Sequence, residues 1–211
     1  MENERVSQAA GGAGAARLAG MEPLVLASSS PRRSEILRAV GWEFETCPAD
    51  VDETPRAGEA PDEYVQRLAR EKAGAVASSR LFGLVLGADT TVVVGGDILG
   101  KPRDEEEAAE MLRRLAGRWH EVLTGVALVR AETGRAVVGL ERTRVRFAET
   151  TEEEIAWHVR TGQLLDKAGA YAIQGRAALF IEAIEGDYWN VVGLPVRLVY
   201  ELAKRAVSRE S

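Results

Sequence analysis

Residues 24–33 have the sequence LVLASSSPRR, which joins a short apolar run to three serines, a proline and two arginines. The apolar run is typical of a buried strand. Ser30 is a favoured N-cap residue, and Pro31 suits the first position of a helix. Gly41 then favours the end of that helix. The stretch therefore predicts a strand, a tight loop and a helix over residues 24–41.

The rest of the chain mixes strand-like and helix-like patterns without strict alternation. Strands are expected where short apolar or alternating runs occur, and helices where apolar residues recur every three to four positions. A capping box at Thr151 and Glu154 and a Gly95-Gly96 hairpin turn mark element boundaries. We therefore expect an α/β fold around a mixed sheet. The expected strands are 42–47, 84–86, 91–94, 122–129, 142–147 and 179–184, and the expected helices are 61–80, 104–117, 151–162 and 195 onward.

Small residues suggest where regular structure stops. The strand 84–86 is expected to end at Gly87-Ala88-Asp89-Thr90, and the strand 122–129 to be interrupted at Thr124-Gly125. A Gly-rich stretch at 167–175 predicts a loop. Residues 186–195 are expected to form a second loop that leads into the terminal helix.

Composition limits the classes of protein and partner. The 27 basic and 33 acidic side chains give a net charge of −6, whereas proteins that coat nucleic acid usually carry a basic surplus. Cys47 is the one cysteine, so an intrachain disulfide and a Cys-based zinc site are excluded. No apolar run approaches the ~18 residues that span a bilayer, and the N-terminus lacks the apolar core of a secretory signal. We expect a flexible extension at 1–22, one domain at 23–207 and a cytoplasmic location, with no nucleic-acid or membrane partner.

Several polar groups are candidates for binding an anion. Arg32 and Arg33 lie in the first turn of an expected helix, where the helix dipole disfavours cations. A bound phosphate explains this placement better than two solvated arginines, because helix N-termini and guanidinium groups both bind phosphate. Lys101 lies between a glycine and a proline, on a loop that could hold it against phosphate or leave it exposed. By its local sequence alone, Lys72 is expected to be a surface lysine.

Two acidic positions are candidates for metal binding or catalysis. Asp89, among small residues at the expected strand end, could bind a divalent cation or act as a general base on water. The alternative is a turn aspartate that binds its own backbone. Glu53 could hold Mg²⁺ or Mn²⁺, although a solvated turn is the simpler interpretation of its loop. His120 and His158 are far apart in sequence and give little support to a serine triad or a His-rich metal site.

Five segments together resemble the Maf-like nucleotide pyrophosphatases, a family also called septum-formation inhibitors. Each segment is weak alone, but the five in this order are a specific signal, and the resemblance spans about Pro23 to Leu202. The segments are Leu26-Ala27-Ser28-Ser29-Ser30-Pro31-Arg32-Arg33, Gly87-Ala88-Asp89-Thr90, Gly100-Lys101-Pro102-Arg103-Asp104, residues 166–175 (DKAGAYAIQG) and Val192-Gly193-Leu194-Pro195.

The resemblance implies a fold similar to that of inosine triphosphate pyrophosphatases, with a mixed elongated sheet, flanking helices and two lobes around a cleft. It implies hydrolysis between the α- and β-phosphates of a nucleoside triphosphate, with Mg²⁺ or Mn²⁺ as cofactor and a homodimeric assembly. The positions that match the family pattern are Asp89 as proton acceptor, Arg32, Thr90 and Gln174 for substrate choice, Arg33, Lys72 and Lys101 for phosphate, and Glu53 with Asp89 for the metal.

Subfamily features favour the dTTP/UTP type, with modified pyrimidine nucleotides as further substrates. The 7-methyl-GTP type tends to have Trp, Gln and Glu at the positions of Arg32, Thr90 and Gln174. The loop Val51-Asp52-Glu53-Thr54-Pro55 is also common in that second type, which therefore stays an alternative. A non-catalytic nucleotide-binding regulator of cell division is a further alternative, but it would need no water-activating carboxylate at Asp89.

Overall fold

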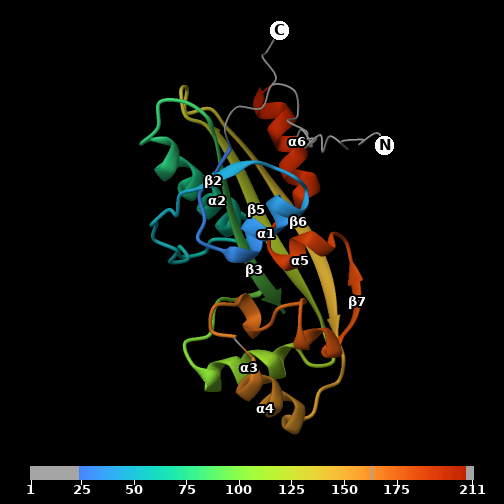
Figure 1. The fold of residues 1–211 in the computed structure, drawn as a ribbon. Coiled ribbons are helices and arrows are strands. Elements are labelled where there is room, and N and C mark those ends of the chain that lie inside the picture. Colours follow the sequence, from blue (N-terminus) through green and yellow to red (C-terminus); the bar gives the residue numbers. More distant parts are fainter. Residues whose placement is uncertain (1–23, 163, 208–211) are drawn as a thin grey trace, which may run out of the picture.

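The computed structural model of the protein describes residues 24–162 and 164–207 (Figure 1). Within these residues, seven strands form one sheet in the order β2-β1-β3-β5-β6-β7, and β4 pairs with one end of β3. The first three strands of this order are parallel and the later pairs are antiparallel, which confirms the predicted mixed sheet. The strands are β1 (Leu24–Leu26), β2 (Phe44–Thr46), β3 (Leu84–Val94), β4 (Asp97–Leu99), β5 (Trp119–Arg130), β6 (Ala136–Phe147) and β7 (Ile181–Glu185).

Helices cover both faces of the parallel end of the sheet (Figure 1). On β3, Leu84 and Leu86 face one helical layer while Val85 faces the other, because successive strand residues point to opposite faces. This two-sided burial explains why Leu84, Val85 and Leu86 are all apolar. One layer contains α1 (Pro31–Ala39) and α6 (Val196–Val207), and the other contains α2 (Pro61–Ala77).

A second apolar cluster lies at the other end of the long strands, where α3 (Glu105–Leu115) and α4 (Glu152–Thr161) pack (Figure 1). Both helices begin as the sequence predicts. Asp104 accepts a hydrogen bond from the Glu107 backbone amide, and Thr151 with Glu154 forms the complete capping box. That these two ends of the molecule form two lobes around a cleft stays a prediction.

The segment 24–41 folds as predicted into β1, a loop and α1. Pro31 begins the helix, and Gly41 follows its end with a φ of 75°. Ser30 occupies the N-cap position with extended backbone angles, but its side chain makes no capping hydrogen bond. Ser30 therefore leaves the first amide groups of α1 uncapped. Uncapped amide groups at a helix N-terminus can donate to a bound anion.

Two predicted strand breaks are wrong. β3 continues through Gly87-Ala88-Asp89-Thr90, and β5 continues through Thr124-Gly125. The glycines instead make room for α2: a Cβ on Gly87 would lie 2.2 Å from the Ala69 carbonyl oxygen, and one on Gly125 would lie 2.2 Å from that of Val65. Asp89 is consequently in the middle of a strand, directly beneath a helix.

The expected loop 186–195 is also partly wrong, because it contains the short helix α5 (Tyr188–Val192). Asp187 caps this helix by accepting a hydrogen bond from the Trp189 amide. The buried Asn190 amide donates to the Val122 carbonyl and the Thr143 hydroxyl, so contacts from two distant strands hold the helix in place. Similarly, the strand expected from residue 179 begins at Ile181, after the 3₁₀ turn Arg176–Phe180.

The N-terminal extension expected at 1–22 lies outside the described residues. In the part of the chain that the structure describes, no helix is long and apolar enough to cross a membrane.

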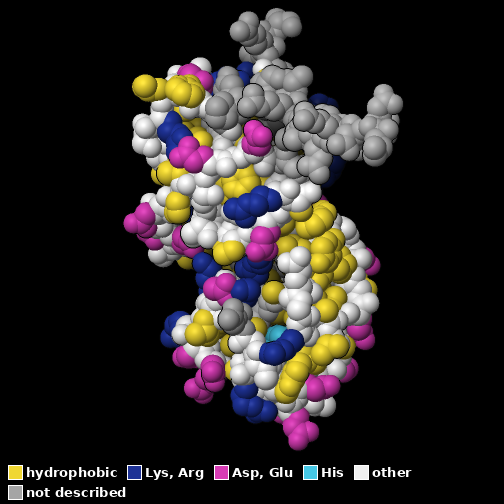
Figure 2. Space-filling view, in the orientation of Figure 1, with side chains coloured by type: hydrophobic (Ala, Val, Ile, Leu, Met, Phe, Trp, Pro, Cys, Tyr) yellow, Lys and Arg dark blue, Asp and Glu magenta, His cyan; other side chains and the backbone are white. Residues whose placement is uncertain are grey.

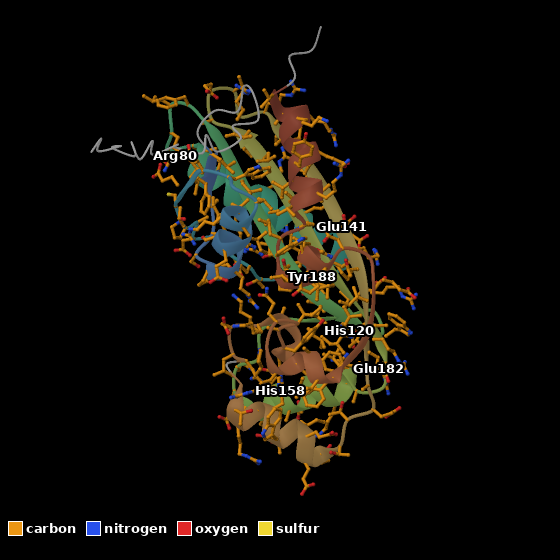
Figure 3. All side chains as sticks on the ribbon, turned by 45° about the vertical axis from the view of Figure 1, so that its right-hand side comes forward. Arg80, His120, Glu141, His158, Glu182 and Tyr188 are labelled. Atoms are coloured by element: carbon orange, nitrogen blue, oxygen red, sulfur yellow. The ribbon has the colours of Figure 1, made fainter. Side chains whose placement is uncertain are left out.

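His120 and His158 come from different elements, β5 and α4 (Figure 3). His120 is 2 % exposed, its Nε2 lies 2.7 Å from the Tyr171 hydroxyl, and its ring contacts the rings of Tyr171 and Phe147. Burial lowers the pKa of His120 to about 4. The histidine is therefore a neutral member of the core.

This burial predicts acid sensitivity. Between pH 6.5 and 4 the unfolded chain binds a proton at residue 120 that the folded chain does not, so the free energy of unfolding decreases as pH falls. We expect a loss of about 2 kcal/mol from this group between pH 7 and pH 5, and a smaller loss in His120→Gln. Urea unfolding of both proteins at the two pH values measures the difference. An equal loss in the variant would contradict the assignment.

Candidate active site

A pocket of about 550 Å³ lies where the β1–α1 loop, β3 and the 3₁₀ turn Ala168–Ala170 come together. In Figure 2, basic and acidic side chains gather at mid-height of the face shown. The pocket lining includes seven of the eight residues that the sequence singled out. They are Arg32, Arg33, Glu53, Lys72, Asp89, Thr90 and Lys101.

Gln174 is the eighth candidate, and it does not line this pocket. Gln174 is exposed. It follows the buried Ile173 and precedes Gly175, which has a φ of 97°. The involvement of Gln174 in substrate choice stays a prediction.

A lysine between two carboxylates forms the centre of the pocket. The Lys72 Nζ lies 2.6 Å from Asp89 Oδ1 and 2.7 Å from Glu53 Oε1. Lys72 and Asp89 are only 8 % and 7 % exposed, so the expectation of a surface lysine is wrong. The reason is the close approach of α2 to β3 at Gly87. It brings Lys72, which lies on that helix, into contact with Asp89, two positions further along the strand.

The environment of Asp89 makes its carboxylate more basic than a solvated one. Burial raises the pKa of Asp89, the nearby Lys72 and Arg33 oppose this rise, and Glu53 adds to it. A raised carboxylate pKa beside a pocket is typical of a group that accepts a proton during a reaction. Asp89 is thus well placed to act on a water molecule.

The Arg33 guanidinium is held by three acceptors from separate parts of the fold. It donates through Nε to the Gly193 carbonyl at 3.0 Å, through Nη1 to the Ser28 hydroxyl at 3.1 Å, and through Nη2 to the Thr90 hydroxyl at 3.2 Å. The Thr90 hydroxyl also lies 2.9 Å from that of the buried Thr124. Burial lowers the pKa of Arg33, and the Asp89 charge opposes this. The cation is therefore fixed beside the candidate base.

Arg32 and Lys101 line the pocket with fewer constraints. Arg32 is half-buried, and burial lowers its pKa while the charges of Asp166 and Glu35 oppose this. Lys101 is exposed, on the loop after β4. Together with the α1 N-terminus, these cations make a site suited to a polyanion such as a triphosphate.

The site also depends on residues that the sequence motifs do not indicate. Tyr64, an aromatic residue on α2, lines the pocket. Thr124, where the sequence predicts a strand break, lies behind the pocket and is wholly buried against Thr90, which lines it. The alternation of side chains along a continuous β5 could have revealed Thr124, but no local signal distinguishes Tyr64 from its apolar neighbours.

The carboxylates of Glu53 and Asp89 share one cation, the Lys72 ammonium. Among the described residues, no group of three or more His, Cys, Asp or Glu side chains could hold a metal ion by itself. Mg²⁺ in nucleotide sites is usually bound by one or two carboxylates together with phosphate oxygens and water. The pair therefore fits a metal that arrives with its nucleotide.

Comparison with known proteins agrees with the resemblance seen in the sequence. The family model described as Maf-like protein matches residues 23–206. The chain is 54% identical over 182 residues to a dTTP/UTP pyrophosphatase of Symbiobacterium thermophilum, covering 86% of this chain and 93% of that protein. It is 54% identical over 180 residues to a dTTP/UTP pyrophosphatase of Hahella chejuensis (84% and 89% covered) and 52% identical over 183 residues to one of Myxococcus xanthus (87% and 92% covered). The chain belongs to the Maf-like protein family.

Proposed function

We propose that this chain hydrolyses nucleoside triphosphates, dTTP and UTP first among them, to the monophosphate and pyrophosphate, and so removes unwanted nucleotides from the pool. The observation that carries the proposal is the buried Asp89 carboxylate with raised pKa, 2.6 Å from Lys72 and in the same pocket as two arginines. The names of the relatives support the choice of substrate.

The triphosphate binds by its charge. Its phosphate oxygens lie against the N-terminus of α1, where Arg32 and the amide groups contact them, and Arg33 holds a fixed positive charge beside them. Lys72 and Lys101 neutralise the remaining charge. Because such chemistry depends mainly on positioning and charge stabilisation, the rigid mounting of Arg33 is an advantage.

Hydrolysis follows from the position of Asp89. Its carboxylate accepts a proton from a water molecule, and the water oxygen bonds to the α-phosphorus. The bond from the α-phosphorus to the oxygen that bridges it to the β-phosphorus breaks, and its electron pair leaves with pyrophosphate. Lys72 stabilises the Asp89 carboxylate before the transfer, and Arg33 stabilises the charge that develops on phosphate.

Glu53 and Asp89 are the residues that would hold a Mg²⁺ or Mn²⁺ ion. When bound, such an ion neutralises phosphate charge and makes the phosphorus more open to attack. By the same family resemblance we propose that the protein works in the cytoplasm and that it forms a homodimer. Sedimentation analysis of the purified chain tests the homodimer.

Substrate choice is proposed to involve Arg32, Thr90 and Gln174. The Thr90 hydroxyl is within hydrogen-bond distance of Arg33 and Thr124, so it acts on substrate through the orientation of the guanidinium. The Gln174 amide offers both a donor and an acceptor, as a pyrimidine edge requires.

Gln174→Glu is expected to redirect base preference, because a carboxylate lacks the donor that a pyrimidine carbonyl needs. We expect the ratio of kcat/KM for UTP to that for purine nucleotides to fall by about tenfold or more. Pyrophosphate release from a panel of nucleotides measures this ratio. A ratio equal to that of the wild-type protein would remove Gln174 from base recognition.

The deciding experiment is pyrophosphate release from canonical, modified and 7-methylated nucleoside triphosphates, with Mg²⁺ or Mn²⁺. Preferential turnover of dTTP and UTP supports the proposal. Preference for 7-methyl-GTP would place the chain with the second type. Nucleotide binding without any turnover would favour the non-catalytic regulator.

A further inference from the structure

Glu53 belongs to a segment of irregular structure between β2 and α2, here called the Glu53 segment and defined as residues 50–58. Its side chain is 48 % exposed, although its carboxylate contacts the buried Lys72. An exposed carboxylate on an irregular segment is not fixed by packing. Its position depends on what holds the backbone of the segment.

Tyr64 binds the backbone of this segment at Glu53 itself. The Tyr64 hydroxyl donates to the Glu53 carbonyl oxygen at 3.0 Å. Burial, together with the Asp89 and Glu53 charges, raises the pKa of Tyr64 to about 12, so the phenol keeps its proton at neutral pH. The hydroxyl therefore has a proton to donate to this carbonyl at neutral pH.

Arg67, one helical turn further along α2, makes a second tie. Its Nη2 donates to the Thr54 carbonyl at 3.3 Å. The guanidinium is itself fixed by two hydrogen bonds to Glu59, of 2.5 Å and 2.7 Å, and lies 5.6 Å from the Tyr64 ring centroid. Consecutive carbonyl groups of the Glu53 segment are thus bound by two side chains that also contact each other.

The same helix binds both the backbone and the side chain of Glu53. Tyr64 and Lys72 are eight positions apart on α2, which places them on one face of the helix. The first binds the Glu53 carbonyl and the second binds its carboxylate. Because Lys72 also contacts Asp89, these contacts connect the Glu53 backbone to the second carboxylate of the site.

We propose that Tyr64 is a positioning residue whose hydroxyl holds the Glu53 backbone, so that the Glu53 carboxylate stays beside Lys72 and Asp89. For its effect on catalysis this inference rests on the proposed function. The competing account is that the Tyr64 ring packs against the substrate. Tyr64→Phe separates the two, because it removes the hydroxyl and keeps the ring.

The first test does not need activity. Amide hydrogen exchange of the protein without nucleotide is measured for wild type, Tyr64→Phe and the control Tyr200→Phe, which changes a tyrosine on α6 outside the pocket. Loss of one hydrogen bond changes a local opening equilibrium by about three- to tenfold. We expect exchange in residues 50–58 to rise by that factor in Tyr64→Phe and to stay unchanged in the control.

The second test is kinetic and uses Glu53→Gln as a background. In the wild-type background, Tyr64→Phe should lower kcat for pyrophosphate release by about three- to tenfold with little change in KM. In the Glu53→Gln background the same substitution should change kcat little, because the carboxylate it positions is already gone.

Two results would overturn the inference. In the first, Tyr64→Phe has the same hydrogen exchange in residues 50–58 and the same kcat as the wild-type protein. In the second, Tyr64→Phe lowers kcat as strongly in the Glu53→Gln background as in the wild-type background. If the wild-type protein releases no pyrophosphate from any nucleotide, the proposed function fails. The exchange measurement then still decides whether Tyr64 holds the segment.

Discussion

Replacing Asp89 with Asn should reduce pyrophosphate release by at least about 10²–10⁴-fold, the usual contribution of a general base. The amide has nearly the same shape, but it cannot accept a proton from water. Lys72 keeps its second partner, Glu53, so the buried ammonium is not left without a counter-charge. The pocket also loses one negative charge, so the affinity for a triphosphate, measured without the divalent ion that Asp89 would help to hold, should be unchanged or higher.

Steady-state kinetics and equilibrium nucleotide binding together test this expectation. Asp97→Asn is a suitable control, because Asp97 is a strand residue with a side chain that is 72 % exposed and paired with Arg114, away from the pocket. It should retain the wild-type rate. A near-normal rate in Asp89→Asn would refute the assignment, and a loss of rate accompanied by unfolding would leave Asp89 without a demonstrated role in the chemistry.

Gly87→Ala should destabilise the fold by about 3 kcal/mol or more, an unusually large effect for one methyl group. The new Cβ would lie 2.2 Å from the Ala69 carbonyl oxygen and 2.7 Å from the Ala73 amide nitrogen, both backbone atoms of α2. Neither atom can move by rotating a side chain. The helix must therefore shift away from the sheet, and Lys72, which it carries, moves away from Asp89.

Gly74→Ala is the matched control for this substitution. Gly74 lies on the same helix, and a Cβ there would have nothing within 4 Å. Alanine is the better helix former by about 1 kcal/mol, so this variant should be as stable as wild type or more so. Urea unfolding measures both variants. Equal stability of Gly87→Ala and wild type would show that α2 does not need this close approach.

The site was largely predictable as a set of residues, but not as an arrangement. Arg32 and Arg33 could be assigned to an anion site because a cation in a first helical turn conflicts with the helix dipole. Lys72 could be included only through family resemblance, since its neighbours in sequence are equally polar. Tyr64 had no signal at all, because an amphipathic helix uses an aromatic residue in its apolar stripe as readily as in a pocket wall.

The sequence by itself determined what short-range physics controls. The β1–α1 unit, the Gly95-Gly96 turn and the capping box at Thr151 formed as predicted, since each depends on residues within a few positions of one another. The motifs also predicted the family, which the family model and the relatives confirm.

The tertiary structure alone decided which groups meet. Lys72 and Asp89 are 17 positions apart, and Arg33 and Gly193 are 160 apart. Whether such pairs touch depends on how closely a helix approaches a sheet, and that distance is set by two glycines that local rules assign to strand ends. Because the interior is close-packed and Gly87 has no Cβ, α2 can lie against β3 at this point. Lys72 is therefore buried beside Asp89, where the site is formed.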